Sequence, residues 1–483
     1  MYGRTRRIHF IGIGGSGMSG IAEVLINLGY QVSGSDLKST EITERLIQLG
    51  GRVMPGHDPV NVEGAQIVVY STAVRDDNLE LQAARAAGIP VIPRADMLAE
   101  LMRMKYGIAV GGSHGKTTTT SMIAAVLARG GLDPTLVVGG RLHGLGSSAR
   151  LGHGRFMVAE ADESDGSFLR LAPAMTVITN VDREHLDHYP DLEAIRQAFV
   201  YFANRVPFYG VSILCVDDPQ VREILPRLTK RHVRYGTGAE CDVRGVGIQL
   251  LPHGSRMTVE AFGHPLGALE LHVPGHHNAL NALAAVSVGL EVEVGFGQIA
   301  EALADFRGVA RRFETRGEAN GVRVVDDYGH HPTEIVATLA AARGLGVRVL
   351  VIFQPHRYSR TAALQAEFAG AFGDAHRVWV LEIYAAGESA LPGISGRTLV
   401  ESAALAGARH VEFAPDAAAA AAAAAREARP GDIVITLGAG DVWRLGDRVL
   451  EGLRSAAAAG ASDAGPPLGA ADARPAGERG VRR

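Results

Sequence analysis

Cysteine is scarce in this chain of 483 residues, which contains only Cys215 and Cys241. Two scattered cysteines without a CxxC motif exclude a disulfide scaffold and indicate a reduced, intracellular protein. Apolar runs are short as well: none approaches the roughly 20 residues that span a bilayer. The segment after the basic start has only about six apolar residues, too few for a signal peptide. We therefore expect a cytoplasmic protein without membrane insertion.

The chain also lacks an excess of basic charge, because its formal net charge is -4. Binding to nucleic acid or to anionic membranes in general has no electrostatic support, whereas local anion sites remain open. Apolar residues make up 47% and charged residues 21%, as in ordered globular proteins. Since single cores stop growing near roughly 250 to 300 residues, two or three domains are expected.

Short β-branched segments alternate with helical patterns along most of the chain, which predicts an α/β fold with parallel sheets. Composition changes near Lys105 to Gly107 and near Arg311 to Phe313, so we predict three modules, residues 1–106, 107–311 and 312–454. An alanine-rich stretch from Pro415 predicts a helix. Residues 455–483 contain few large apolar side chains, which predicts a disordered tail.

The first motif, Gly12 to Gly17, has the pattern GxGxxG between a predicted strand and a predicted helix. Glycine loops in this setting hold a pyrophosphate at the helix N-terminus. Asp36 follows about 20 residues later, where such proteins bind ribose hydroxyls. A nicotinamide cofactor and a UDP-sugar both fit the pattern, and a tight turn without a ligand remains a third interpretation.

A second glycine loop, GGSHGKTTTT from Gly111, lies between the apolar segment Ile108 to Val110 and an apolar helix. Loops that end in Gly-Lys-Thr bind nucleotide phosphates through backbone amides and the lysine, and the threonine hydroxyl ligates Mg2+. Lys116 and Thr117 are the candidates here. Val110 replaces the first glycine of GxxxxGK[ST], so the match to ordinary P-loop NTPases is incomplete.

Carboxylates and histidines follow two later strands. Glu160 begins the acidic run EADESD at the carboxyl end of a predicted parallel strand, where ligands bind. Crowded carboxylates repel one another unless cations are present, so Glu160 is a candidate Mg2+ ligand; a solvated acidic turn is the alternative. His185 follows the next strand in VDREHLDHY and is either a ligand or a packing residue.

Together these motifs resemble the Mur ligases, cytoplasmic enzymes that build the peptide of bacterial peptidoglycan. The resemblance extends from about Ile8 to about Trp443 and includes GIGGSGMSGIA, SGSD, YSTAV, GGSHGKTTTT, AEADESDGSF, TNVDREHLDHY, PGHHNALNALAA, RRFE, DDYGHHPTEI, FQPHRYSRT and LGAGDVW. It implies a Rossmann-like N-terminal domain that binds a UDP-substrate, a central P-loop ATPase-type α/β domain and a C-terminal Rossmann-like ligase domain.

Within the family, GIGGSGMSGIA, DDYGHHPTE and FQPHRYSRT are most similar to the branch that joins L-alanine to UDP-N-acetylmuramate with ATP and Mg2+, through an acyl phosphate. The branch that recycles whole peptides ranks second, because its first glycine loop usually differs and it lacks PHRYSRT. Several members carry a carbamoylated lysine that this chain lacks, having no lysine between Lys116 and Lys230. The family loop usually has threonine where this chain has Ser113.

The resemblance assigns roles to matching positions. The expected catalytic residues are Lys116, His185, Arg357 and Arg360. Expected ATP contacts are Gly112, Ser113, His114, Gly115, Lys116, Thr117, Thr118, His277 and Asn281, and expected Mg2+ ligands are Thr117, Glu160 and His185. Expected UDP-substrate contacts are Gly14, Gly15, Ser16, Gly17, Asp36, Ser71, Tyr328 and His330.

Other interpretations remain open at some of these positions. Asn278 and Asn281 could cap a helix, and Arg357 and Arg360 could form a surface salt-bridge pair. Two other classes of protein compete with a ligase. A nicotinamide-dependent oxidoreductase would explain GxGxxG and Asp36 but not the second loop, and a non-catalytic nucleotide switch would explain that loop alone. The oligomeric state is not readable from the sequence.

Overall fold

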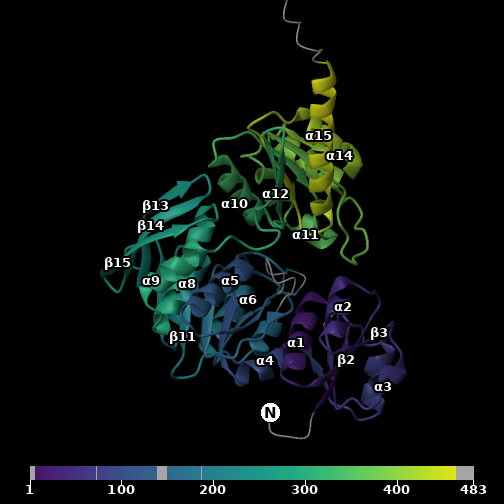
Figure 1. Cartoon of the computed structure of the whole chain (residues 1–483), viewed down its shortest axis with the longest axis vertical. Coiled ribbons are helices and arrows are strands. Elements are labelled where there is room, and N and C mark those ends of the chain that lie inside the picture. Colours follow the sequence, from purple (N-terminus) through teal and green to yellow (C-terminus); the bar gives the residue numbers. More distant parts are fainter. Residues whose placement is uncertain (1–5, 72, 139–148, 187, 464–483) are drawn as a thin grey trace, which may run out of the picture.

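The computed structural model describes residues 6–71, 73–138, 149–186 and 188–463, and its sheets define three modules (Figure 1). The N-terminal module contains a five-stranded sheet, the central module a ten-stranded sheet and the C-terminal module a six-stranded sheet. The predicted three-domain α/β fold is confirmed. The exact module boundaries stay a prediction.

The N-terminal module has a wholly parallel sheet of order β3-β2-β1-β4-β5. Its elements are β1 (Arg7–Ile11), α1 (Ser16–Asn27), β2 (Gln31–Asp36), α2 (Glu41–Gln48), β3 (Arg52–Pro55), η1 (Pro59–Val62), β4 (Ile67–Tyr70), α3 (Leu79–Ala86), β5 (Val91–Pro93) and α4 (Arg94–Arg103). The strand order reverses at β1, so the first glycine loop emerges at a switch point, where ligands bind in such sheets.

Glu80 is the centre of a buried polar network in this module. Ser35 Oγ donates to Glu80 Oε2 at 2.5 Å, Asn61 Nδ2 donates to Oε1 at 2.6 Å, and His9 Nε2 lies 3.5 Å from Oε2. Burial alone would raise the pKa of Glu80, but these three contacts outweigh it and lower the pKa to about 2. The network ties α3 to β1 and β2.

Replacing Glu80 with glutamine should make the free energy of unfolding depend less on pH in the acidic range. Because its folded pKa is depressed, Glu80 contributes stability fully above its ordinary pKa near 4.5, and loses it as pH falls toward about 2. We expect Glu80→Gln to lower the free energy of unfolding at pH 7 by about 2 kcal/mol. Urea unfolding from pH 7 downwards tests this, with exposed Glu44→Gln as control. An unchanged acid slope in Glu80→Gln would contradict it.

The central module has the sheet order β15-β14-β13-β12-β11-β10-β6-β9-β7-β8. Its elements are β6 (Tyr106–Gly111), α5 (Lys116–Arg129), β7 (Thr135–Val137), β8 (Ala149–Arg150), β9 (Phe156–Glu160), η2 (Ser167–Arg170), β10 (Met175–Ile178), α6 (Leu192–Asn204), β11 (Val211–Cys215), α7 (Pro219–Ile224), η3 (Leu225–Arg227), β12 (His232–Gly236), β13 (Val243–Leu251), β14 (Gly254–Ala261), β15 (His264–Leu271), α8 (His276–Glu291) and α9 (Phe296–Ala304). The second glycine loop leaves β6 between β10 and β9, again at a switch point.

This sheet departs from the predicted parallel pattern at its two ends. β13, β14 and β15 form antiparallel pairs, as do β7 and β8. Phe262 and Gly263, which join β14 to β15, have φ values of 51° and 82°. Two successive residues with positive φ make the tight turn that reverses a chain into a hairpin, so no crossover helix intervenes.

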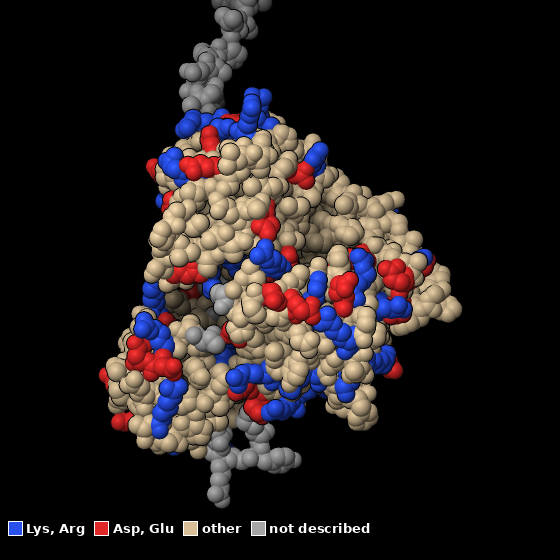
Figure 2. All heavy atoms as spheres, turned by 180° about the vertical axis from the view of Figure 1, so that it is seen from behind, with Lys and Arg blue, Asp and Glu red and all other residues tan. Residues whose placement is uncertain are grey.

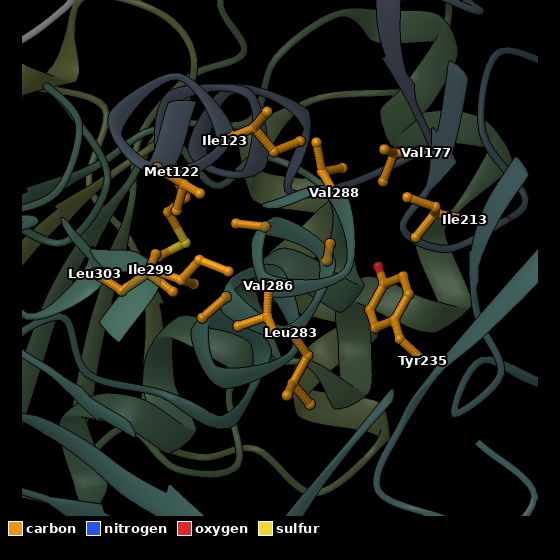
Figure 3. Close-up of a cluster of buried hydrophobic side chains, with 14 of the residues drawn as sticks. Met122, Ile123, Val177, Ile213, Tyr235, Leu283, Val286, Val288, Ile299 and Leu303 are labelled. Atoms are coloured by element: carbon orange, nitrogen blue, oxygen red, sulfur yellow. The ribbon is translucent and has the colours of Figure 1, made fainter. Parts of the chain in front are cut away.

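The core of the central module fixes α5, the helix that follows the second glycine loop. Met122 and Ile123 of α5 pack with Leu283 of α8 and with Ile299 and Leu303 of α9, all fully buried (Figure 3). Burial of each large apolar side chain contributes about 1.5–3 kcal/mol. The loop is therefore attached to a rigid helix.

The C-terminal module has the sheet order β16-β17-β21-β18-β19-β20, parallel except for β16 with β17. Its elements are β16 (Glu314–Ala319), β17 (Val322–Asp327), α10 (Pro332–Arg343), β18 (Val349–Phe353), α11 (Tyr358–Ala363), α12 (Gln365–Gly370), β19 (Arg377–Val380), α13 (Gly396–Leu405), β20 (Val411–Phe413), α14 (Ala417–Glu427), β21 (Ile433–Leu437), η4 (Val442–Arg444) and α15 (Leu445–Asp463). The alanine-rich stretch forms α14, as predicted.

The predicted tail begins too early. α15 continues through residues 455–463, because the alanines there favour helix and follow the buried anchors Leu450 and Leu453. The remainder of the predicted tail, 464–483, lies outside the described residues.

Acidic and basic side chains are interspersed over the face in Figure 2. In the described ranges no helix has the length and apolar character needed to cross a bilayer.

Candidate active site

A cavity of about 1500 Å³ lies where the three modules meet. The predicted site residues that line it are Gly15, Gly17 and Ser71 of the N-terminal module, Ser113, His114, Gly115, Lys116, Thr117, Glu160 and His185 of the central module, and Tyr328, His330, Arg357 and Arg360 of the C-terminal module. Gly14, Asp36, Gly112, Thr118, His277 and Asn281 do not line it. Ser16 begins α1, and its side chain lies outside the described part of the structure.

Lys116, the first residue of α5, is held inside the glycine loop. Its Nζ donates to the carbonyl oxygens of Gly112 at 2.6 Å and Ser113 at 3.1 Å, and to both carboxylate oxygens of Glu163 at 2.8 and 2.9 Å. Burial alone would lower the pKa of Lys116. The negative charges of nearby carboxylates, above all Glu163, outweigh burial and raise the pKa. Lys116 is therefore a fixed cation at the mouth of the loop.

Glu163, Glu184 and His185 bring their ligand atoms within 4.8 Å of one another beside Lys116. His185 Nε2 lies 3.4 Å from Glu163 Oε1 and 3.8 Å from Glu184 Oε2. His185 has a φ of 56°, a backbone conformation that non-glycine residues adopt mainly where the surroundings enforce it. Burial favours the neutral ring, but the carboxylates outweigh burial and raise the pKa of His185. The group could hold a divalent cation.

Arg360 brings positive charge from the C-terminal module to this acidic group. Its Nη2 lies 3.1 Å from Glu184 Oε1, and the two side chains are 11% and 6% exposed. Burial alone would raise the pKa of Glu184. The hydrogen bond from His330 and the charges of nearby histidines outweigh burial and hold the pKa well below the ordinary range. Arg360 therefore forms a buried pair between modules, not the surface salt bridge considered from sequence.

His114 of the glycine loop joins a second contact between the central and C-terminal modules. Its Nε2 lies 3.0 Å from Asp182 Oδ2, which also accepts a hydrogen bond from Thr333 Oγ1 at 2.6 Å. Burial alone would lower the pKa of His114, but Asp182 and Glu334 outweigh it and raise the pKa to about 10. The His114 and His331 rings lie 4.9 Å apart. The loop is thus linked to α10 as well as to its own sheet.

The first glycine loop lies against an arginine that sequence reasoning missed. A Cβ at Gly17 would stand 2.6 Å from Arg94 Nη1, so a side chain there would displace the end of the Arg94 side chain. Arg94 begins α4 directly after β5 and lines the cavity, with Nη2 3.7 Å from Asp162 Oδ2. Positive charge at the N-terminus of α1 suits an anion such as pyrophosphate. Its position after a parallel strand is the signal that could have identified Arg94.

Asp36 and Asn281 contact the loops instead of lining the cavity. Asp36 Oδ2 accepts the N–H of Gly14 at 2.9 Å. Asn281 is buried, accepts a hydrogen bond from Thr119 Oγ1 at 3.1 Å, and would lie 2.8 Å from a Cβ at Gly115, whose φ is 81°. His277 is exposed on α8. Asn281 lies in the body of α8, beyond the N-cap Gly275, so the capping interpretation is wrong.

Tyr328 and His330 connect the cavity to the linker before β16. The guanidinium carbons of Arg311 and Arg312 lie 5.0 and 5.2 Å from the Tyr328 ring centre. His330 Nε2 lies 3.7 Å from Glu184 Oε1. These contacts place both predicted residues beside the arginines and acids of the cavity.

A glycine loop with a lysine, carboxylates beside it and arginines from another module is typical of enzymes that use nucleoside triphosphates. Family models match all three modules: the Mur ligase catalytic domain at residues 7–106, the Mur ligase middle domain at 110–289 and the Mur ligase glutamate ligase domain at 311–440. The chain belongs to the Mur ligase family, as the sequence motifs predicted.

Relatives in this family extend over nearly the whole chain. The UDP-N-acetylmuramate--L-alanine ligase of Syntrophotalea carbinolica is 56% identical over 94% of this chain and 99% of its own, and that of Solibacter usitatus is 54% identical over 94% and 97%. The crystal structure of UDP-N-acetylmuramate-alanine ligase MurC from Thermotoga maritima has a TM-score of 0.77 and 30% identity, with 93% and 99% coverage. A murein peptide ligase from Psychrobacter arcticus, 23% identical with a TM-score of 0.69, shares the fold.

Proposed function

We propose that this chain joins L-alanine to UDP-N-acetylmuramate in an ATP-dependent reaction of peptidoglycan synthesis. The relatives above support the substrates by their names and their identity. The single structural observation that carries the proposal is the cavity itself, in which Lys116, Arg357 and Arg360 face a common space from two modules. Such a space suits a reaction that brings the carboxylate of one substrate against the phosphates of ATP. Because the reaction consumes ATP, we place the enzyme in the cytoplasm.

The reaction has two steps. The lactyl carboxylate oxygen of the muramyl group attacks the γ-phosphorus of ATP, and the bond to ADP breaks, which leaves an acyl phosphate. The amine of L-alanine then attacks the acyl carbon, and the bond between that carbon and the phosphate oxygen breaks. Phosphate leaves with the electron pair of this bond, and the amine loses a proton. Negative charge accumulates on the transferred phosphoryl group in the first step, and on the acyl oxygen and the departing phosphate in the second.

Lys116 would contact the β and γ phosphates, because a lysine at the end of a glycine loop has that position in P-loop enzymes. Arg357 and Arg360 would neutralise phosphate and carboxylate oxygens, which arginine binds through two parallel hydrogen bonds. These cations are partly buried, which strengthens their effect on a developing negative charge.

Mg2+ fits this donor set. Glu163, Glu184 and His185 converge within 4.8 Å, and Thr117 and Glu160 line the same cavity. Carboxylate and hydroxyl oxygens are ligands that Mg2+ prefers. Bound there, Mg2+ would neutralise phosphate oxygens. We therefore propose Thr117, Glu160 and His185 as ligands, and we add Glu163, whose Oε1 lies 3.4 Å from His185 Nε2.

Phosphate release from ATP tests the proposal. The purified chain is given ATP, Mg2+ and UDP-N-acetylmuramate, with L-alanine, with no amino acid, or with the tripeptide L-alanyl-γ-D-glutamyl-diaminopimelate. We expect release that requires L-alanine. Release with the tripeptide alone would assign the chain to the peptide-recycling branch, and NADH fluorescence enhancement without release would favour an oxidoreductase.

A further inference from the structure

Arg357 has a backbone conformation that side chains rarely adopt. Its φ is 69° and its ψ is 137° at the start of α11. Such conformations are unfavourable for non-glycine residues and persist only where the surrounding structure enforces them. Arg357 is also a cavity residue. The contacts that enforce this conformation therefore determine how the arginine is presented.

The segment from Tyr384 to Glu388 contacts the chain on both sides of Arg357. The Arg357 N–H donates to the Tyr384 carbonyl oxygen at 2.9 Å, and the Tyr384 N–H donates to the Pro355 carbonyl oxygen at 2.8 Å. The rings of His356 and Tyr384 are stacked, 9° from parallel with centroids 5.5 Å apart. These contacts hold the backbone that leads into Arg357.

Glu388 holds the chain that follows Arg357 through hydrogen bonds from Ser359. Glu388 Oε2 accepts the Ser359 N–H at 3.0 Å, and Oε1 accepts the Ser359 hydroxyl at 2.6 Å. Burial alone would raise the pKa of Glu388, but the bonds from Ser359 outweigh it and lower the pKa, so the acceptor is a carboxylate. Ser359 lies between Arg357 and Arg360 in the sequence. Both carboxylate oxygens of Glu388 therefore hold the residue that separates the two arginines.

The segment also contains a turn that is closed by a hydrogen bond of its own. The Glu388 N–H donates to the Ala385 carbonyl oxygen at 3.0 Å, and Ala386 and Gly387 have φ values of 50° and 88°. Two central residues with positive φ form a tight primed turn, which directs the residue that follows. A Cβ at Gly440 would stand 2.8 Å from Tyr384 Cγ, so the segment also packs closely on a backbone.

We propose that Glu388 is a positioning residue of the ligation reaction, which holds the first turn of α11 so that Arg357 and Arg360 face the cavity. Glu388 is absent from the described residues that line the cavity, so it acts through Ser359. The effect on turnover rests on the proposed function. The effect on α11 does not.

Amide hydrogen exchange of the full chain without substrates tests the effect on α11. In Glu388→Ala we expect exchange in residues 357–363 to accelerate about tenfold, because two hydrogen bonds to the carboxylate are lost. Glu388→Gln retains acceptor capacity and should fall between this variant and the unaltered chain. Glu401→Gln, an exposed acid on α13, is the matched control and should change nothing. Unchanged protection in Glu388→Ala would overturn the proposal.

A double-mutant cycle tests the route through Ser359. We expect Glu388→Ala to lower kcat about tenfold and Ser359→Ala about threefold, with melting temperatures close to that of the unaltered chain. If Glu388 acts through Ser359, the double variant has the kcat of Glu388→Ala. Losses that multiply would overturn this route. An unaltered chain without ligase activity would instead reject the proposed function, while the exchange experiment would still decide the role of Glu388 in holding α11.

Discussion

Replacement of Lys116 with methionine should lower kcat about a thousandfold or more, because the phosphates lose the buried cation that faces them. Lys116 Nζ has four hydrogen-bond acceptors within 3.1 Å, so its place in the glycine loop is well defined. Phosphate release with all three substrates is the measurement. Lys230→Met, at a residue that does not line the cavity, is the control and should retain full activity. A Lys116→Met enzyme with more than a tenth of the activity would contradict this role.

The same substitution has a separate effect on stability. Glu163 is 2% exposed, and without Lys116 its carboxylate remains buried with less compensation. We expect the free energy of unfolding to fall by about 3 kcal/mol, as when one partner of a buried ion pair is removed. Adding Glu163→Gln should restore most of that stability but none of the activity. If the double variant regained activity, the role of Lys116 in phosphate contact would be rejected.

Replacement of Arg360 with lysine should lower kcat about a hundredfold although the charge is kept. A guanidinium donates from fixed, planar positions, and Arg360 Nη2 reaches Glu184 while Nη1 lies 3.3 Å from the His356 carbonyl oxygen. A single ammonium cannot reproduce both directions. Steady-state kinetics with varied L-alanine and UDP-N-acetylmuramate measures the loss.

A second pair between the same modules supplies the control for Arg360. Arg183 Nη1 lies 3.3 Å from Glu367 Oε1, and these side chains are 55% and 44% exposed. Exposed pairs contribute little, so Arg183→Lys should change kcat less than about twofold. Equal losses in Arg360→Lys and Arg183→Lys would show that both arginines only join the modules.

The fold was largely predictable because its signals are local. Apolar runs such as Val349 to Phe353 form buried parallel strands, and both glycine loops begin where a strand ends and a helix starts. The hairpins β13–β15 were missed, because strands that alternate with helices predict parallel sheets and antiparallel hairpins have no helix between their strands. The tail was predicted to begin too early, at residue 455, because the scarcity of large apolar side chains was weighed above the helix preference of alanine.

The site was less predictable because its contacts join distant parts of the chain. Glu163 meets Lys116 across 47 positions of sequence, and Arg360 meets Glu184 across 176. Periodicity locates the strand that each residue follows, but not which side chains meet at the edge of the sheet. Glu163 and Glu184 stood in motifs that were recognised, yet their pairing with cations required the fold. The roles of the individual residues stay predictions until the variants are measured.

The most direct test of the central claim is the identity of the product. The chain is incubated with ATP, Mg2+, UDP-N-acetylmuramate and isotopically labelled L-alanine, and the nucleotide fraction is analysed by mass spectrometry. We expect one labelled alanyl residue attached by an amide bond to the UDP-N-acetylmuramate, in equal amount to the ADP formed. ATP hydrolysis without labelled nucleotide, or attachment of a tripeptide but not of L-alanine, would contradict it.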